Sequence, residues 1–208
     1  MAYTRWKDLD AVEKYARSRY RHWDQKWVDL RERSMVRRIL RKNAIKGPIL
    51  DAPVGYGRFQ PLLREFGRLT ALDLNYYAAL YQPEILGLCD WAINGSCEAL
   101  PFRDNTFETI FSFRLLQHMH EPVERINILR EFARVSKRWV IVSAYIGSPL
   151  HRLHRILVPQ PSKITILDNK TFYEEAKSAG LRPIKRLSLL RGFHAHRIFL
   201  CTTDSASD

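Results

Sequence analysis

The 208-residue sequence predicts an α/β fold, with a mostly parallel sheet covered by helices on both faces. Between residues 47 and 145, short apolar runs rich in β-branched residues alternate with segments whose apolar residues recur at helical spacing. The last two strand-like runs, 183–190 and 196–202, are separated by a link of only a few residues. A link this short can join two strands only as a hairpin. The last strand is therefore expected to be antiparallel to the one before it.

Composition indicates a globular protein: 46% of the residues are hydrophobic and 27% are charged. The sequence contains no apolar run near the roughly 18 residues of a membrane span, and residues 1–27 lack the apolar segment of a signal peptide. Cys89, Cys97 and Cys201 are odd in number and have no metal-ligand spacing. These features predict one domain, residues 1–208, in a reduced cytoplasmic protein without a metal site.

The net charge of +12 is concentrated at the two ends of the chain. Residues 1–46 contain fourteen Lys or Arg against six Asp or Glu, and residues 146–208 contain ten against five. Residues 47–145 contain ten against eleven and are close to neutral. Basic flanks favour an acidic partner, such as a phosphorylated lipid or glycan, a membrane surface or a nucleic acid. The alternative is that the excess of cations only keeps the protein soluble.

The N-terminal flank predicts two helices, at 8–28 and at about 30–43. In the second, Leu30, Val36 and Ile39 recur at helical spacing beside an Arg-rich face. A basic amphipathic helix can bind a membrane or RNA, or it can pack on a sheet with its charges in water. Both interpretations are open from the sequence.

The middle of the chain predicts the parallel sheet, and the C-terminal part adds a helix and the hairpin. Residues 147–168 form an irregular stretch with three prolines. The expected strands are 49–51, 69–73, about 90–94, 109–113, 139–143, 183–190 and 196–202, and the expected helices are 59–66, about 76–81, 122–136 and 171–179. Val123, Ile126, Leu129, Phe132 and Ala133 are expected on the buried face of the helix 122–136, and Thr171 or Asn169 is expected to cap the last helix.

Two acids end successive strands around a glycine turn: Asp51 precedes Gly55 and Gly57, and Asp73 ends the next strand. In a doubly wound sheet both strand ends lie at the edge where ligands bind. The second acid is then placed to accept hydrogen bonds from the two hydroxyls of a ribose. A dinucleotide fingerprint would require a third glycine where the chain has Gln60, which argues against NAD.

Several motifs between residues 47 and 145 resemble one family. Residues 51–57 are similar to motif I of class I S-adenosylmethionine-dependent methyltransferases, D-x-G-x-G-x-G, with Pro53 in place of the first glycine. Residues 71–73 are similar to the ribose-binding acid of motif II. The run 95–108 and the segments 113–119 and 129–135 resemble the small-molecule subgroup related to the ubiquinone and menaquinone methyltransferases. The resemblance implies a Rossmann-like sheet of seven strands and S-adenosylmethionine as the cofactor.

The resemblance also implies roles for individual residues. Asp51 would orient the methionine end of the cofactor, Asp73 would bind the ribose diol, and the backbone N–H of Cys97 would point at the adenine. The family usually has an acid at the position of Ser96, so cofactor affinity would be lower here unless Glu98 assists. The full expected cofactor set is Asp51, Pro53, Gly55, Gly57, Asp73, Leu74, Ser96, Cys97, Glu98, Phe113 and Arg114.

A methyl transfer to oxygen requires the acceptor to lose its proton, which favours a base next to the transferred methyl group. His118 and His120 follow the fourth strand and are the nearest candidates, because a neutral imidazole suits this task at pH 7. The alternative is that His118 only packs at the start of a helix.

The acceptor pocket is expected to form from the family-variable parts, 1–46, 146–168 and the hairpin within 169–204. The acceptor-side candidates are Tyr15, Arg19, Tyr20, His151, Arg152, His154, Arg155, Arg191 and His194. Their charge favours an anionic small molecule, lipid or glycan, with peripheral contact to the inner membrane surface. An RNA methyltransferase and a non-catalytic cofactor-binding partner protein are the two alternatives.

Overall fold

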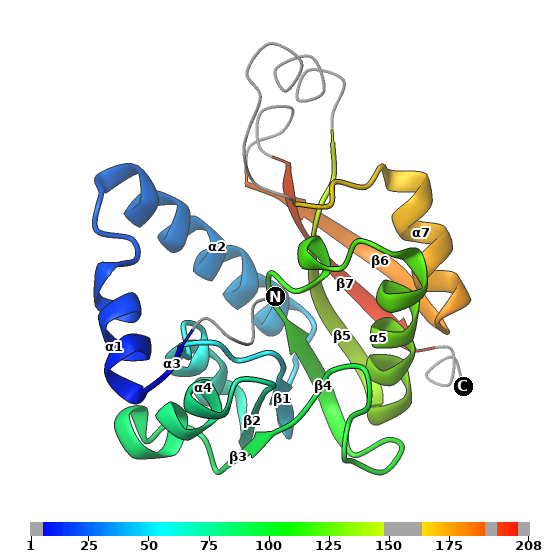
Figure 1. Ribbon diagram of the computed structural model, residues 1–208. Coiled ribbons are helices and arrows are strands. Elements are labelled where there is room, and N and C mark those ends of the chain that lie inside the picture. Colours follow the sequence, from blue (N-terminus) through cyan, green and yellow to red (C-terminus); the bar gives the residue numbers. More distant parts are fainter. Residues whose placement is uncertain (1–5, 148–163, 190–194, 204–208) are drawn as a thin grey trace.

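The computed structural model describes residues 6–147, 164–189 and 195–203, and is built around one seven-stranded sheet (Figure 1). The strand order is β3-β2-β1-β4-β5-β7-β6. The strands are β1 (Ile49–Asp51), β2 (Leu69–Asp73), β3 (Trp91–Asn94), β4 (Phe107–Ser112), β5 (Ser136–Tyr145), β6 (Leu181–Ser188) and β7 (His196–Thr203).

The register places the carboxyl ends of the central strands side by side. β1 pairs in parallel with β2 on one side and with β4 on the other, so Asp51 is in register with both Ala71 and Phe111. The chain therefore leaves β1 in one direction and later returns on its other side, which opens a crevice beyond the carboxyl end of β1. β7 runs antiparallel to both β5 and β6, which confirms the expected antiparallel last strand.

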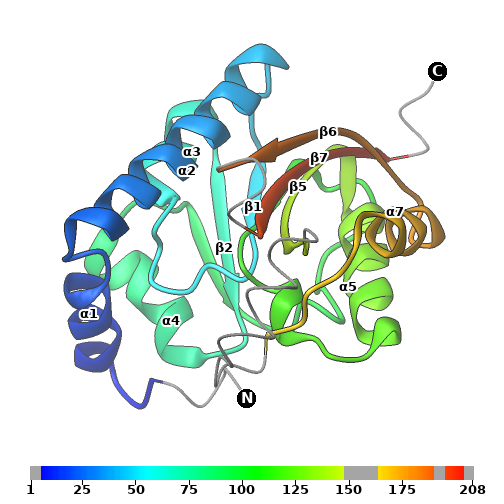
Figure 2. The same ribbon diagram turned by 90° about the horizontal axis from the view of Figure 1, so that it is seen from above.

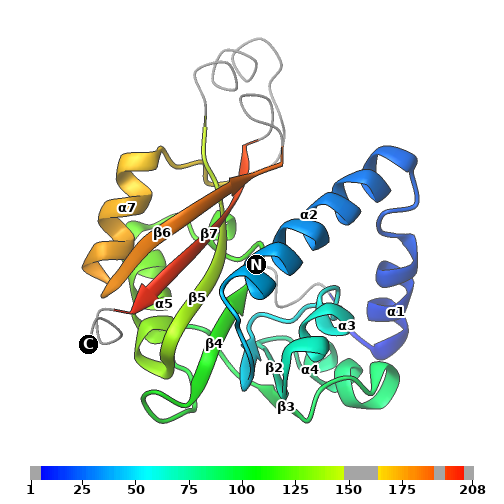
Figure 3. The same cartoon turned by 180° about the vertical axis from the view of Figure 1, so that it is seen from behind.

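Helices cover both faces of the sheet, as Figures 2 and 3 show from two further directions. One face carries the N-terminal helices α1 and α2 together with α3 and α4, and the other carries α5 and α7. The longer helices are α1 (Leu9–Ser18), α2 (Trp23–Lys42), α5 (Pro122–Val135) and α7 (Asn169–Ser178). The short ones are α3 (Gln60–Leu63), η2 (Arg64–Phe66), α4 (Tyr76–Tyr81), η3 (Gln82–Leu86) and η4 (Leu116–His118).

The expected single helix over residues 8–28 is wrong, because the chain turns between α1 and α2. α1 begins at its cap Asp8 and ends at Ser18, and Tyr20 adopts a left-handed backbone with φ of 61°. The turn carries the Tyr20 ring onto the guanidinium of Arg58, at 4.4 Å from the ring centroid. A continuous helix would forgo this contact, so the tertiary partner decides the local structure.

Two smaller expectations on the second face are also corrected. Val123 of α5 is 60% exposed, because the buried stripe of this helix begins instead at Arg125, which pairs with Glu175 of α7. The cap of α7 is Asp168, whose carboxylate accepts a hydrogen bond from the backbone N–H of Thr171 at 2.8 Å. An Asp in this position satisfies one of the free N–H groups of the first turn.

Candidate functional site

The carboxyl ends of β1 and β2 bring two buried carboxylates together with the glycine turn. Asp51 is 2% exposed and Asp73 is 8% exposed. The Asp73 carboxylate accepts a hydrogen bond from the backbone N–H of Gly55 on one oxygen and from that of Asn75 on the other, each at 2.8 Å. Asp73 therefore ties the glycine turn to the end of β2.

The electrostatics of this pair favour a cationic ligand. Burial raises the pKa of Asp51 well above its usual value, and the nearby Asp73 charge adds to this, while the amide of Gln60 opposes it. Burial also raises the pKa of Asp73, partly offset by its two backbone hydrogen bonds. A positive group near Asp51 would restore the ionised form, because an opposite charge favours it.

The two glycines of the turn have different surroundings. Both have left-handed backbones, with φ of 57° at Gly55 and 74° at Gly57. A Cβ at Gly55 would meet only the Trp6 ring, at 3.9 Å, so the turn is accessible there. A Cβ at Gly57 would collide with the side chains of Leu86 and Gln82. Gly55 thus offers open backbone to a ligand, whereas Gly57 allows η3 to pack closely.

The residues expected to border an adenine lie beyond β3, next to these carboxylates. Cys97 is buried, and burial together with the charges of Asp73 and Asp51 raises the pKa of its thiol. The Ser96 hydroxyl accepts a hydrogen bond from the backbone N–H of Glu98 at 3.1 Å, and the Glu98 side chain is exposed. Leu74 is also exposed, at 51%, directly after Asp73.

Phe113 and Arg114 follow β4 at the same edge of the sheet. The Phe113 ring packs on Phe59 with 4.5 Å between centroids. Arg114 has a left-handed backbone with φ of 61°, and its N–H donates to the hydroxyl of Ser143 on β5 at 2.7 Å. This turn leaves the Arg114 side chain 23% exposed at the end of the strand.

A buried charge cluster that was not predicted from the sequence adjoins Arg114. Glu32 of α2 is 0% exposed, and its carboxylate lies 2.6 Å from Arg58, 3.1 Å from Arg114 and 2.8 Å from Nδ1 of His196. We call these four residues the Glu32 cluster. They come from α2, the glycine turn, the end of β4 and the start of β7, so the cluster joins the N-terminal helix to the ligand-binding edge.

The charges within the Glu32 cluster are stabilised by one another. Hydrogen bonding to His196 and the charges of Arg114 and Arg58 hold the pKa of Glu32 far below its usual value, against the effect of burial. Burial lowers the pKa of His196, so its imidazole is neutral at pH 7. One sequence signal pointed to Glu32: it lies four residues before the buried Val36 and seven before the buried Ile39, on the apolar stripe of the helix.

The candidate acceptor-side residues of α1 and of the turn after it lie near this edge. Tyr15 packs edge-on against Tyr56 of the glycine turn, with 5.4 Å between ring centroids. The Arg19 side chain is exposed and lies over the Tyr20 ring at 5.2 Å. The remaining candidates lie outside the described residues: His151, Arg152, His154, Arg155, Arg191 and His194.

The two histidines proposed as bases, His118 and His120, are exposed on the segment that follows β4. The Nε2 atom of His118 lies 3.3 Å from the side-chain amide of Gln117. Nδ1 of His120 lies 3.0 Å from the hydroxyl of Thr165. In the described part of the chain, no three side chains of His, Cys, Asp or Glu are placed to hold a metal ion.

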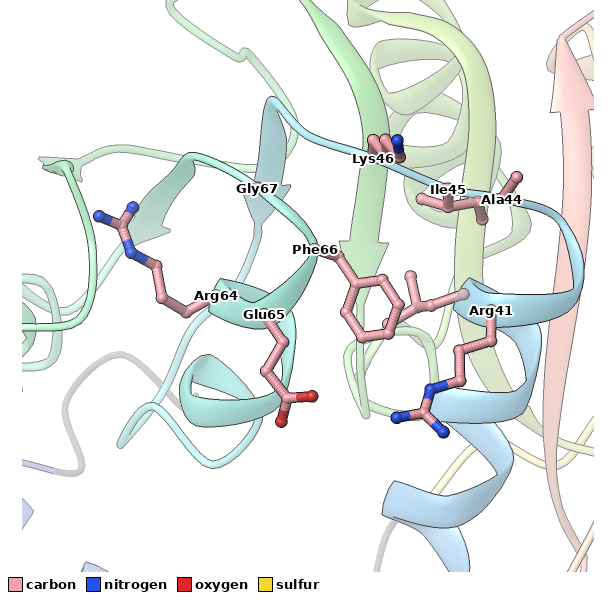
Figure 4. A pocket seen from close by; sticks show the side chains of 9 residues that line it. Arg41, Ala44, Ile45, Lys46, Arg64, Glu65, Phe66 and Gly67 are labelled. Atoms are coloured by element: carbon pink, nitrogen blue, oxygen red, sulfur yellow. The ribbon is translucent and has the colours of Figure 1, made fainter.

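A shallow groove of about 520 Å³ lies at the opposite end of the sheet, between the end of α2 and η2 (Figure 4). Its lining includes Arg41, Lys46 and Phe66, which precede β1 and β2 and therefore lie at the amino ends of these strands. The groove is thus separate from the edge that carries Asp51 and Asp73.

No helix among the described residues is long and apolar enough to cross a membrane.

Comparison with known proteins agrees with this geometry. Residues 50–142 match the family model described as "Methyltransferase domain". A search of curated protein sequences found no significant match. The fold is similar to that of magnesium protoporphyrin IX methyltransferase from Synechocystis PCC 6803 with bound S-adenosylhomocysteine, at 15% identity and a TM-score of 0.71, covering 94% of this chain and 100% of that one. It is also similar to a SAM-dependent methyltransferase from Aquifex aeolicus, at 18% identity and a TM-score of 0.65, covering 94% and 98%.

The residues present fit S-adenosylmethionine. The open backbone at Gly55 leaves room for the ligand, and the buried Asp51 favours a positive group. Asp73 retains lone pairs for a ribose diol beside its two backbone hydrogen bonds. Residues 50–142 match the methyltransferase domain model. The seven-stranded sheet with its antiparallel last strand is the fold of solved S-adenosylmethionine-dependent methyltransferases.

Proposed function

We propose that the protein transfers a methyl group from S-adenosylmethionine to an anionic small-molecule, lipid or glycan acceptor. One observation carries the choice of an anionic acceptor. Helix α2, which belongs to the strongly basic segment 1–46, packs its Glu32 against Arg114 and His196 at the carboxyl edge of the sheet. The basic N-terminal flank thus lies beside the ends of β4 and β5, where an acceptor would meet the cofactor.

Residues of the described edge are assigned roles in holding the cofactor. Asp51 would attract the ammonium group of the methionine part, directly or through a water, and Asp73 would accept from the two ribose hydroxyls. The backbone N–H of Cys97 would donate to the adenine. These roles are supported by the burial of the three side chains and by the raised pKa values of the two acids.

The cofactor supplies a methyl group on a positively charged sulfur, which an acceptor can take by in-line displacement. The contribution of the protein is then to position the acceptor and to exclude water. Phe113, packed on Phe59, would form an apolar wall beside the reacting groups. His118 and His120 stay candidates for removing a proton, because both are exposed on the segment after β4.

A labelling experiment tests the proposal. Cell extract is incubated with the protein and S-adenosylmethionine that carries a radioactive methyl group, and the extract is then separated into lipid, glycan, small-molecule, RNA and protein fractions. The expected result is label in one of the first three fractions, retained on an anion exchanger. An Asp73→Ala variant serves as the background control. Label in RNA alone would overturn the choice of acceptor, and cofactor binding without label in any fraction would favour a non-catalytic protein.

A further inference from the structure

The arginines of the Glu32 cluster differ from an ordinary buried arginine of the same protein. Arg125 of α5 uses all three of its nitrogen groups: Nε and Nη2 donate to Glu175, and Nη1 donates to the carbonyls of Met119 and His120. Such a guanidinium has a structural role, because each of its three nitrogens donates a hydrogen bond within the fold.

Arg58 and Arg114 each have N–H groups without a hydrogen-bond acceptor among the described residues. The side chain of Arg58 is 7% exposed, and its Nε and Nη2 face Asp29 and Glu32, both at 2.6 Å. Among the described residues, Nη1 of Arg58 and Nε of Arg114 are buried without a hydrogen-bond partner. Arg114 reaches Glu32 only through Nη2, at 3.1 and 3.3 Å from the two carboxylate oxygens. A buried donor without a partner is costly, so a hydrogen-bond acceptor from outside the fold would be favourable at these two N–H groups.

The charges around this point leave one positive charge in excess. Arg33, Arg58 and Arg114 contribute three positive charges, and Asp29 and Glu32 contribute two negative ones. His196 adds none, since burial keeps it neutral. Burial also raises the pKa of Tyr20, which stays uncharged at neutral pH. The local field therefore favours one monovalent anion.

Aromatic rings enclose the same place. The Arg58 guanidinium lies over the rings of Tyr20 and Phe113, at 4.4 and 5.4 Å from their centroids. The imidazole of His196 packs against the rings of Phe113 and Tyr145, with centroids at 5.0 and 5.1 Å. A planar carboxylate fits the fork of a guanidinium, and rings on either side suit an apolar body attached to it.

We propose that Arg114, supported by Arg58, binds a carboxylate of the methyl acceptor at the edge formed by β4, β5 and β7. The inference deepens the proposed function and rests on it. It narrows an anionic acceptor to a carboxylic acid with an apolar, preferably aromatic, body. The proposal moves Arg114 from the cofactor set expected from the sequence to the acceptor. The methionine part of the cofactor carries the same chemical group, so the experiment must separate the two sources.

The test compares two nucleosides and two small probes by calorimetry. S-Adenosylhomocysteine carries the amino-acid carboxylate, whereas 5′-deoxy-5′-methylthioadenosine keeps the nucleoside and the thioether but lacks it. Benzoate carries a carboxylate on an aromatic ring, and benzamide has the same shape without the charge. Benzoate and benzamide are titrated into the free protein and into the protein saturated with S-adenosylhomocysteine.

The variants are Arg114→Met, which removes the charge, and Arg114→Lys, which keeps the charge without the fork. Arg130→Met is the matched control, because Arg130 is exposed on α5 and bonds only Asn127 among the described residues. Melting curves verify that each variant is folded. If Arg114→Met does not fold, Arg114→Lys carries the comparison.

The expected result is that the unaltered protein binds benzoate at least about tenfold more tightly than benzamide, and that Arg114→Met loses this difference while Arg130→Met keeps it. Both nucleosides should bind Arg114→Met as they bind the unaltered protein. If Arg114→Met instead weakens S-adenosylhomocysteine about tenfold and leaves methylthioadenosine unchanged, the carboxylate belongs to the cofactor, and the acceptor assignment is overturned.

Unchanged binding of all four ligands in the Arg114 variants would overturn the site altogether. Failure of both nucleosides to bind the unaltered protein would instead contradict the proposed function. The benzoate titration of the free protein still decides whether Arg114 holds a carboxylate in that case.

Discussion

Nδ1 of His196, at the start of β7, lies 2.8 Å from a carboxylate oxygen of Glu32 on α2. Burial lowers the pKa of the imidazole, so it is neutral at pH 7 and adds no positive charge beside the carboxylate. The contact joins the basic N-terminal flank to β7, the strand of the hairpin that pairs with β5, at the ligand-binding edge. Glu32 is thus the common partner of three groups from three other elements.

Replacing Glu32 is therefore expected to destabilise the fold strongly. Glu32→Gln leaves Arg58 and Arg114 without their shared counter-charge, and losing one partner of a buried ion pair costs about 3–5 kcal/mol. Urea unfolding followed by circular dichroism measures the change. Glu13→Gln is the matched control, because Glu13 pairs with Arg17 on the surface of α1 and should cost less than about 0.5 kcal/mol. Equal effects of the two variants would contradict the central role of Glu32.

Asp51→Asn is expected to stabilise the cofactor-free protein at neutral pH. The pKa of Asp51 in the folded protein is raised, so its contribution to stability is present below its usual pKa and is lost as the pH rises through the folded value. The variant should melt above the unaltered protein at pH 7, and the difference should vanish below about pH 4. Asp10→Asn, at an exposed carboxylate of α1, should give no comparable trend. A lower melting temperature of Asp51→Asn at pH 7 would contradict this account.

Asp73→Ala is expected to weaken S-adenosylhomocysteine by at least about tenfold, since hydrogen bonds to a charged group contribute about 1.5–3 kcal/mol each. The change also removes the acceptor for the N–H of Gly55, so the glycine turn should no longer be held at the end of β2 and should become more mobile. Calorimetry gives the affinity, and amide hydrogen exchange at Gly55 reports the turn. Asp104→Ala, at an exposed residue paired with Arg134, should leave both unchanged. An unaltered affinity of Asp73→Ala for S-adenosylhomocysteine would contradict the proposed role of Asp73 in binding the ribose.

The strands and the acids that end them could be predicted because their signals are local. β1 and β2 are short apolar runs, and Asp51 and Asp73 follow directly from the boundaries of these two strands. The turn at Tyr20 and the charge cluster around Glu32 could not be predicted in this way. Their partners lie on the glycine turn and on β7, and no pattern within α1 or α2 specifies these contacts. A single acid on the apolar stripe of α2 was the only trace in the sequence.

The glycine motif shows the same limit, since two residues of one pattern have separate tasks. Gly57→Ala would push the side chains of Leu86 and Gln82 aside. The amide of Gln82 donates to the carbonyls of Gly55 and Ala78, at 2.9 and 2.7 Å, so its displacement would loosen the turn as well. We expect the overpacking in Gly57→Ala to cost about 1–3 kcal/mol of unfolding free energy, and the left-handed backbone at this position to add about 1 kcal/mol.

Gly55→Ala should affect ligand binding more than the packing of the cofactor-free protein. Its Cβ would enter open space, with only the Trp6 ring at 3.9 Å, so the cost in the cofactor-free protein is that of a left-handed alanine, about 1 kcal/mol. The same Cβ would occupy the backbone surface that the cofactor approaches, and S-adenosylhomocysteine should bind more weakly than to the unaltered protein. Thermal melts with and without this ligand separate the two effects. A Gly57→Ala variant that melts normally and loses only ligand binding would show that both glycines face the cofactor, against the contacts of Gly57 with η3.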